Sequence, residues 1–258
     1  MTCQFLQLEK QNAVGILRFN RPERLNAFET VMVQEVPVAL RELLEDDGVR
    51  VVIITGNGKG FCAGADLQLL NELVTAKDFA TGKTVVSAGN DVVTMIHAAE
   101  KPVIAALNGP AAGGGAGIAL SCDIRLMAQS ATIGFTFIRL GLHPDLSCTY
   151  FLPRLVGPAK AAELFMTGEM IAADETLRLR MVNQVVPDDE LMPTALRLAS
   201  AIAEKSPLAL RLMKKGLQQT LEQPLDAMLK YETYAQSLCF ESKEAAEAMQ
   251  KFLAAREK

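Results

Sequence analysis

Two glycine-rich segments are well suited to chemistry. Segment 108–123 reads NGPAAGGGAGIALSCD and segment 55–67 reads TGNGKGFCAGADL. Each follows an apolar run typical of a buried strand and precedes an apolar stretch typical of a helix. Glycine lets a backbone N–H approach a ligand closely, and a helix N-terminus adds partial positive charge. If the two loops end neighbouring parallel strands, two N–H groups can bind one oxyanion formed from a carbonyl.

Neither segment matches a nucleotide-binding fingerprint. A G-x-G-x-x-G match starting at Gly113 needs Gly or Ala at position 118, which is Ile, and a start at Gly115 fails at Leu120. No Gly-Lys-Ser/Thr follows, so a P-loop is excluded. A tight turn with close helix packing would explain the glycines of either loop taken alone.

Apolar periodicity predicts the elements that must position these loops. Continuous runs such as VRVVIIT suit strands buried on both faces, and we predict strands over 13–19, 49–55, 102–107 and 123–128. Helical spacing predicts helices over 30–44, 66–74 and 84–100. Thr30 can cap the first helix, and Pro37 should kink it or delay its start. This alternation predicts an α/β fold built from parallel βα units.

The second half of the chain reads as successive helices. We predict them over 160–167, 173–180, 188–204, 207–222, 224–239 and 243–256. Ser206-Pro207 and Gln223-Pro224 mark boundaries, because proline is favoured in the first turn of a helix. A helical tail rich in Ala, Leu and Met after an α/β core suggests a surface that covers a partner subunit.

Composition excludes several classes of protein. The 258 residues are 50% hydrophobic and 22% charged, which is typical of a globular domain. A net charge of −4 without a dense basic run argues against nucleic acid or an anionic membrane as the main partner. Apolar stretches are too short to span a membrane, and the N-terminus has no signal organisation. We expect a cytoplasmic protein.

Metal and disulfide chemistry are not indicated. Two histidines leave little room for a histidine-rich metal site. The five cysteines are scattered, with no CxxC pair, as expected of reduced thiols in the cytosol rather than a disulfide framework.

Four blocks of sequence, in order, resemble the crotonase (enoyl-CoA hydratase/isomerase) superfamily over about residues 4–256. They are NRPERLNAFET, TGNGKGFCAGADL, KPVIAALNGPAAGGGAGIALSCDIRLMA and FIRLGLHPD. The resemblance implies a spiral of β-β-α units over 1–200 and a helical trimerisation region over 201–258. It also implies an acyl-CoA thioester substrate, with CoA as part of the substrate and no separate cofactor or metal, and assembly as a trimer or dimer of trimers.

The resemblance assigns candidate site residues. Ala65 and Gly114 match the two backbone donors of the family's oxyanion hole. Residues matching the CoA path are Arg24, Leu25, Ala63, Asp66 and Leu67. Phe252 resembles a residue that closes the CoA site. The lysine usual three positions later is Ala255 here, which leaves Arg256 or Lys258 as substitutes.

The usual hydratase acids are missing. The resemblance implies two carboxylates for hydration, one to activate water and one to protonate carbon, but the matching positions hold Gly117 and Phe137. Asp145 remains, at the position of the single acidic residue in members that move a double bond, including enoyl-CoA isomerases and the ring-epoxide isomerase of phenylacetyl-CoA breakdown. One base suffices for isomerisation, because it can take a proton from one carbon and return it to another.

The surroundings of Asp145 lead to further expectations. Phe135, Phe137, Leu140 and Leu142 should form an apolar wall at the substrate and raise the pKa of Asp145. Asp145 could also cap a helix, since it follows Pro144. His143 is interpreted as a pocket or loop residue rather than a base.

Other functions are weighed against isomerisation. A hydratase would have to recruit an acid that the sequence does not reveal. Members of this family that carry out hydrolytic dehalogenation use an aspartate at the position of Asp145. They also use a histidine near position 90 and a tryptophan near position 137, which are Asn90 and Phe137 here. A non-catalytic CoA-binding protein, including an RNA-binding member, is the third alternative, and the acidic net charge argues against RNA.

Overall fold

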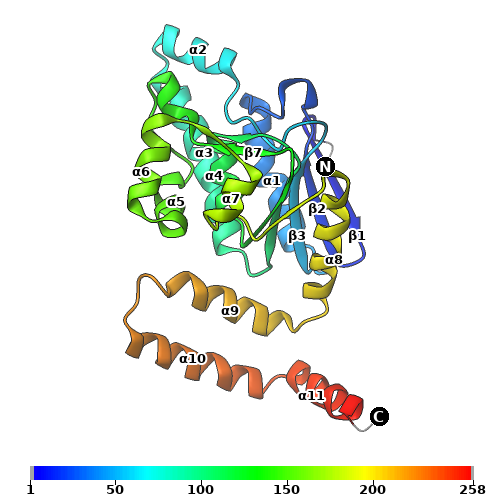
Figure 1. Ribbon diagram of the computed structural model, residues 1–258. Coiled ribbons are helices and arrows are strands. Elements are labelled where there is room, and N and C mark those ends of the chain that lie inside the picture. Colours follow the sequence, from blue (N-terminus) through cyan, green and yellow to red (C-terminus); the bar gives the residue numbers. More distant parts are fainter. Residues whose placement is uncertain (1–2, 257–258) are drawn as a thin grey trace.

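A sheet ordered β1-β2-β3-β4-β6-β9 positions both glycine-rich loops in the computed structural model, which describes residues 3–256 (Figure 1). Its strands are β1 (Leu6–Gln11), β2 (Val14–Phe19), β3 (Val51–Gly56), β4 (Val103–Leu107), β6 (Ile124–Ala128) and β9 (Gln184–Val186). β1 pairs antiparallel with β2, and the other neighbours are parallel. The glycine-rich loops follow β3 and β4, which lie side by side as predicted.

The buried strands β2, β3, β4 and β6 confirm the four predicted strands. Every residue of β3 and β4 is buried, which explains their continuous apolar runs. The edge strand β1 was not predicted, because its sequence LQLEKQ is mostly polar and largely exposed. A second sheet, β5 (Ala111–Ala112), β7 (Thr132–Gly134) and β8 (Met170–Ala172), consists of strands too short to show a pattern.

Helices cover the sheet and extend beyond it. The α-helices are α1 (Thr30–Glu45), α2 (Leu67–Ala76), α3 (Phe79–Ala98), α4 (Gly114–Ser121), α5 (Cys148–Val156), α6 (Pro158–Thr167), α7 (Ala173–Arg178), α8 (Leu191–Ala203), α9 (Pro207–Gln219), α10 (Leu225–Phe240) and α11 (Lys243–Arg256). Three short 3₁₀ helices are η1 (Pro22–Arg24), η2 (Thr136–Leu140) and η3 (Asp188–Glu190). α1 packs against α3, and α8 packs against the central strands.

Several predicted helix ends need correction. The cap of α1 is Glu29, whose carboxylate accepts the Met32 N–H, rather than Thr30, and Pro37 does not delay the start of the helix. α3 begins at Phe79 instead of residue 84, because Asp78 caps it through the Thr81 N–H at 3.0 Å. The predicted helix 188–204 begins with η3 and continues as α8, and α5 was not predicted.

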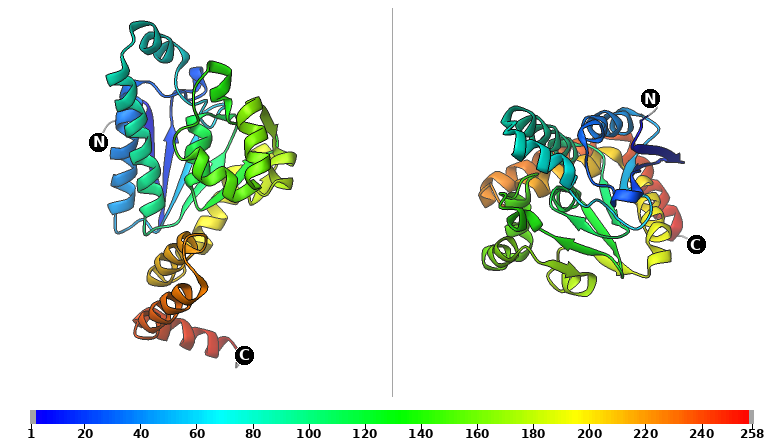
Figure 2. Two further views of the ribbon diagram at one scale, coloured as in Figure 1. Left: turned by 90° about the vertical axis from the view of Figure 1, so that its left-hand side faces the viewer. Right: turned by 90° about the horizontal axis from the view of Figure 1, so that it is seen from above.

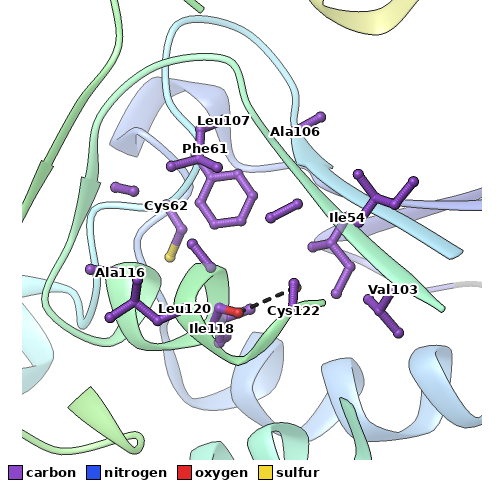
Figure 3. Packing of buried hydrophobic residues seen from close by; sticks show 14 of the residues in the cluster. Ile54, Phe61, Cys62, Val103, Ala106, Leu107, Ala116, Ile118, Leu120 and Cys122 are labelled. Carbon is purple, nitrogen blue, oxygen red and sulfur yellow. Dashed lines mark hydrogen bonds between the residues drawn. The ribbon is translucent and has the colours of Figure 1, made fainter. Parts of the chain in front are cut away.

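α4 lies inside the hydrophobic core. All eight of its residues are buried. Figure 3 shows its Ile118 and Leu120 packed among Ile54, Phe61 and Leu107, with the Cys122 Sγ directed to the Ile118 carbonyl oxygen. Packing of these buried residues therefore holds α4 in place, which suits a helix that must present a backbone N–H at a fixed point.

α9, α10 and α11 extend away from the sheet (Figures 1 and 2). Lys214 of α9 is buried and anchors this region, because its Nζ donates to the Ile96 carbonyl at 2.9 Å and to Asp123 Oδ2 at 2.8 Å. The structure thus confirms an α/β fold with a helical C-terminal region. The boundary at residue 200 and the trimerisation role stay predictions. No helix among residues 3–256 is both long and apolar enough to cross a membrane.

Candidate active site

Ala65 presents its backbone N–H at the end of the loop that follows β3. The Phe28 N–H donates to the Gly64 carbonyl at 2.7 Å, and the Asp66 N–H donates to the Phe28 carbonyl at 2.8 Å. This is a parallel bridge between Phe28 and Ala65, in which the bridged residue directs its own N–H away from its partner. Among the described residues, no group accepts the Ala65 N–H. It is free to bind a ligand.

Gly114 presents a second backbone N–H as the first residue of α4. A donor at this position has no partner within its helix, and no other described residue accepts it. Gly113 before it has φ +52° and ψ −122°, a conformation that only glycine adopts readily. The glycine at 113 therefore sets the direction in which the helix starts.

The two glycine-rich loops touch each other. The Ala112 N–H donates to the Cys62 carbonyl at 2.9 Å. Gly64 has φ +85°, and a Cβ there would lie 2.8 Å from the Ala112 carbonyl oxygen and 3.3 Å from Gly114 N. Only glycine permits this approach. The structure thus brings Ala65 and Gly114 to the wall of one cavity, as the sequence predicts.

That cavity is large and mostly apolar. Its volume is about 640 Å³, within the range usual for small-molecule sites. It lies between α1, α2, α3, the start of α4, η2 and the segment 142–146, with Val36, Leu70, Val85 and Leu142 among the side chains that line it. Ala65 and Gly114 therefore offer two N–H donors beside a space suited to an apolar tail.

Asp145 lines the same cavity and is half-buried. Burial raises the pKa of its carboxyl to about 6, against smaller opposing effects of its own backbone N–H and the charge of His143. This confirms the expected direction. The proposed helix cap is wrong: α5 begins at Cys148, its N-cap residue is Ser147, and no side chain caps it. The Asp145 carboxylate is thus available for proton transfer.

The apolar wall near Asp145 is partly as predicted. Phe137, Leu140 and Leu142 line the cavity. Phe135 does not, because it is fully buried and packs edge-on against Phe165 with ring centroids 5.4 Å apart.

A left-handed turn follows Asp145. Leu146 has φ +45° and Ser147 has φ +63°, which is uncommon for residues other than glycine. The turn drives the Leu146 side chain against α4 and α3: a Cβ on Gly114 would lie 3.1 Å from its Cδ2, and one on Gly89 would lie 2.9 Å from its Cδ1. Sequence reasoning missed this feature, because neither Leu nor Ser signals a left-handed conformation.

Leu146 also closes the space beside Gly117. A Cβ on Gly117 would lie 2.4 Å from the Leu146 carbonyl oxygen and 2.9 Å from Leu146 Cβ. Backbone atoms cannot move aside cheaply, so even alanine overpacks this position. A glutamate grafted at 117 has no room unless the turn is rebuilt.

Gly117→Ala should therefore lower the free energy of unfolding by about 1–3 kcal/mol through overpacking, which outweighs a helix-propensity gain of at most about 1 kcal/mol. Urea denaturation measures this. Gly82→Ala in α3 is the matched control, because a Cβ there meets nothing within 4 Å, and it should be neutral or stabilising. Equal loss in both variants, or none at Gly117, would contradict the packing argument.

The residues predicted for the CoA path are dispersed. Ala63 and Leu67 line the cavity. Arg24 and Leu25 are exposed and lie a few residues before Phe28, which lines the cavity. Leu25 is held to the loop that carries Ala63, because its carbonyl accepts the Ala63 N–H at 3.0 Å. Neither Arg24 nor Leu25 lines the cavity.

Asp66 is buried and engaged within the chain. Arg21 Nη1 donates to Asp66 Oδ2 at 2.6 Å, and the Gln68 N–H donates to Oδ1 at 2.8 Å. Burial opposes ionisation, but these two hydrogen bonds hold the pKa of Asp66 below its usual range. Asp66 caps α2 and fixes the loop that carries Ala65. Arg21, which sequence reasoning did not single out, is its partner.

Phe252 lies on α11, which Figure 1 shows well away from α2 and α3, and it does not line the cavity of its own chain. It is 59% exposed, and the Arg256 guanidinium lies 5.4 Å from the centre of its ring. Lys258 lies outside the described residues. Within residues 3–256 no three His, Cys, Asp or Glu side chains cluster as a metal site would require.

Comparison with known proteins identifies the family. The enoyl-CoA hydratase/isomerase family profile matches residues 9–258. Crotonyl-CoA hydratase from Syntrophomonas wolfei is 38% identical, with 99% of this chain and 97% of the relative covered. The 1,2-epoxyphenylacetyl-CoA isomerase from Escherichia coli is 37% identical, with 98% and 97% covered.

A solved structure agrees with these relatives. The crystal structure of enoyl-CoA hydratase from Bacillus anthracis superimposes with a TM-score of 0.93 at 33% identity, covering 98% of this chain and 97% of that one. The predicted crotonase-like fold is thereby confirmed. The chain, with its paired glycine loops and half-buried Asp145, belongs to the enoyl-CoA hydratase/isomerase family.

Proposed function

We propose that this enzyme shifts the double bond of an enoyl-CoA, with Asp145 as the single acid–base residue. The observation that carries the proposal is the inventory of carboxylates on the cavity wall. Asp78 caps α3, so Asp145 is the carboxylate left for chemistry among the described lining residues. Gly117 and Phe137 carry no ionisable group.

The reaction would run in two proton transfers. The Asp145 carboxylate removes a proton from C2 of a 3-enoyl thioester, and the electron pair of the broken C–H bond forms the enolate. The N–H groups of Ala65 and Gly114 stabilise the negative charge on the thioester oxygen. Asp145 then returns a proton to C4, which leaves the double bond between C2 and C3. A pKa near 6 lets the same group act as base and as acid near neutral pH.

Hydration is the second candidate. Named hydratases are as similar in sequence as the named isomerase, so similarity does not decide between them. Water addition needs a second group to position and deprotonate the water. The residues at positions 117 and 137 cannot supply it, and this favours isomerisation.

A paired assay tests the proposal. In one assay, purified enzyme is given a 3-enoyl-CoA and formation of the 2-enoyl-CoA is measured. In the other, it is given a 2-enoyl-CoA and hydration is measured. Isomerisation should dominate. Hydration as the main activity would overturn the proposal, and the absence of both activities would favour a CoA-binding protein without catalysis.

The wide apolar cavity supports acyl tails longer than four carbons. Gly82 lies on its wall in α3, where a side chain would enter open space. Gly82→Leu should lower kcat/KM for a ten-carbon enoyl-CoA relative to a four-carbon one by roughly 10- to 200-fold, as expected when apolar pocket space is filled.

Thr84→Leu is the matched control for Gly82→Leu. It adds the same side chain to an exposed position of α3 that does not line the cavity. The ratio of the two kcat/KM values should not change. If Gly82→Leu also leaves that ratio unchanged, the tail does not bind along α3.

The remaining predictions belong to the same proposal. CoA arrives as part of the substrate, with Arg24 exposed where a cation can meet its phosphates. Phe252 would then close the CoA site of a second copy of the chain, in a trimer or dimer of trimers within the cytoplasm.

Analytical ultracentrifugation tests this assembly, and a monomer at micromolar concentration would contradict it.

A further inference from the structure

A second titratable side chain shares the cavity with Asp145. His143 lies two residues before it and lines the same wall. The imidazole is exposed, whereas Asp145 is half-buried. Within residues 3–256, His143 makes no hydrogen bond that would commit it to a structural role. An imidazole can accept a proton at one ring nitrogen and donate one from the other.

His143 and Asp145 interact electrostatically. A positive charge on His143 favours the ionised form of Asp145. The other titratable group acting on this centre is Cys148, a buried thiol whose pKa is raised first by burial and then by the charge of Asp145. Asp78 and Lys83, near the start of α3, are the remaining titratable residues of the described wall. His143 is thus the exposed imidazole two residues from the reacting carboxylate on the described cavity wall.

We propose that His143 relays protons between Asp145 and solvent during the double-bond shift. This rests on the proposed function of Asp145. After Asp145 has taken the C2 proton, it is a carboxylic acid. It passes that proton to His143, and the imidazolium exchanges it with water. A solvent proton then returns through His143 to Asp145 and is delivered to C4, so that no proton is gained or lost overall.

Left-handed Leu146 and Ser147 make this arrangement possible. Because the chain turns sharply after Asp145, the Leu146 side chain is buried against Gly114 and Gly89. The residue after Asp145 therefore contributes hydrocarbon to the interior. His143, by contrast, is exposed on the cavity wall, where its imidazole can exchange protons with water.

Deuterium incorporation tests the relay. Turnover in ²H₂O is followed by mass spectrometry, which reads the deuterium placed at C4 of the product. His143→Ala should lower deuterium incorporation per turnover by roughly tenfold, less than the loss of a direct acid–base group, because water still reaches Asp145 slowly. Added imidazole should restore it in the alanine variant. Arg139→Ala is the matched control, because it removes a nearby exposed basic side chain that does not line the cavity.

A second experiment separates this proposal from the isomerase proposal. It measures hydrogen–deuterium exchange at C2 of a saturated acyl-CoA in ²H₂O, a reaction that needs Asp145 and the oxyanion hole but no double bond. If isomerisation fails while this exchange falls in His143→Ala and recovers with imidazole, the relay stands and the isomerase proposal is wrong. Equal exchange in wild type and His143→Ala, or a loss that imidazole does not restore, overturns the relay.

Discussion

Asp145→Asn should lower the turnover of 3-enoyl-CoA by roughly 10²–10⁴-fold, the contribution typical of a positioned acid–base group. The amide has nearly the shape of the carboxyl but cannot accept the C2 proton. Acyl-CoA binding should stay nearly unchanged, because the loss concerns a step made only in the transition state. Steady-state kinetics and a binding isotherm for a saturated acyl-CoA measure the two effects separately.

The variant also carries its own folding control. Burial raises the pKa of Asp145 to about 6, so the folded protein holds this proton more tightly than the unfolded chain. Between the unfolded value and about 6, rising pH therefore weakens the fold, and the charged carboxylate opposes folding at neutral pH. Asp145→Asn should unfold at no lower urea concentration than wild type. Full activity in a folded variant would remove Asp145 from the mechanism.

The same pKa sets the acid limb of the pH profile. The base must be ionised, so kcat/KM of the wild type should fall as pH drops through about 6. A limb near pH 4 would mean that Asp145 is solvated while the enzyme works.

Gly114→Pro should lower turnover by roughly 10²–10³-fold, the loss typical of one missing oxyanion-hole donor. Proline has no N–H, yet it is well tolerated at the first position of a helix, which Gly114 occupies in α4. Substrate binding should be affected less than turnover, because charge on the thioester oxygen grows on the way to the enolate.

Gly114→Ala is the matched control. It adds the same Cβ, 3.1 Å from Leu146 Cδ2, but keeps the N–H. Crowding by the Cβ should therefore appear in both variants, and the difference between them reports the loss of the N–H together with the ring Cδ that takes the place of its hydrogen. Circular dichroism establishes that both fold. Equal activity of the two variants would exclude the Gly114 N–H from catalysis.

How far the sequence predicts this site depends on which interactions are local. Glycine spacing identifies both loops, because close backbone approach restricts residue type, and β3 and β4 are recognisable because burial on both faces demands continuous apolar runs. The course of the chain after Asp145 was missed. It depends on Leu146 entering a space left by Gly89 and Gly117, which lie far apart in sequence.

Two further features that the sequence does not reveal have the same origin. Asp145 follows a proline and resembles a helix cap, but the left-handed residues after it delay α5 until Cys148. The partner of Asp66 was not identified either, because Arg21 lies 45 residues away in sequence; the place of Asp66 on the CoA path stays a prediction. A side chain's type is visible in sequence, whereas its partner is decided by tertiary packing.

The wall formed by α2 and α3 has a fixed end and a compliant end. The buried residues of α3, from Gly89 to Ile96, all lie in its second half, and α2 has none. Lys214 and Gln218 hold the last turn through carbonyl groups of Ile96 and His97. We therefore expect the first turns of α3, near Phe79, to move more readily than the second half of the helix, which is packed against the fold. On the proposed function, we therefore expect strict recognition of the thioester and tolerance of different acyl tails, so that changes near Phe79 alter substrate range without disturbing the reaction.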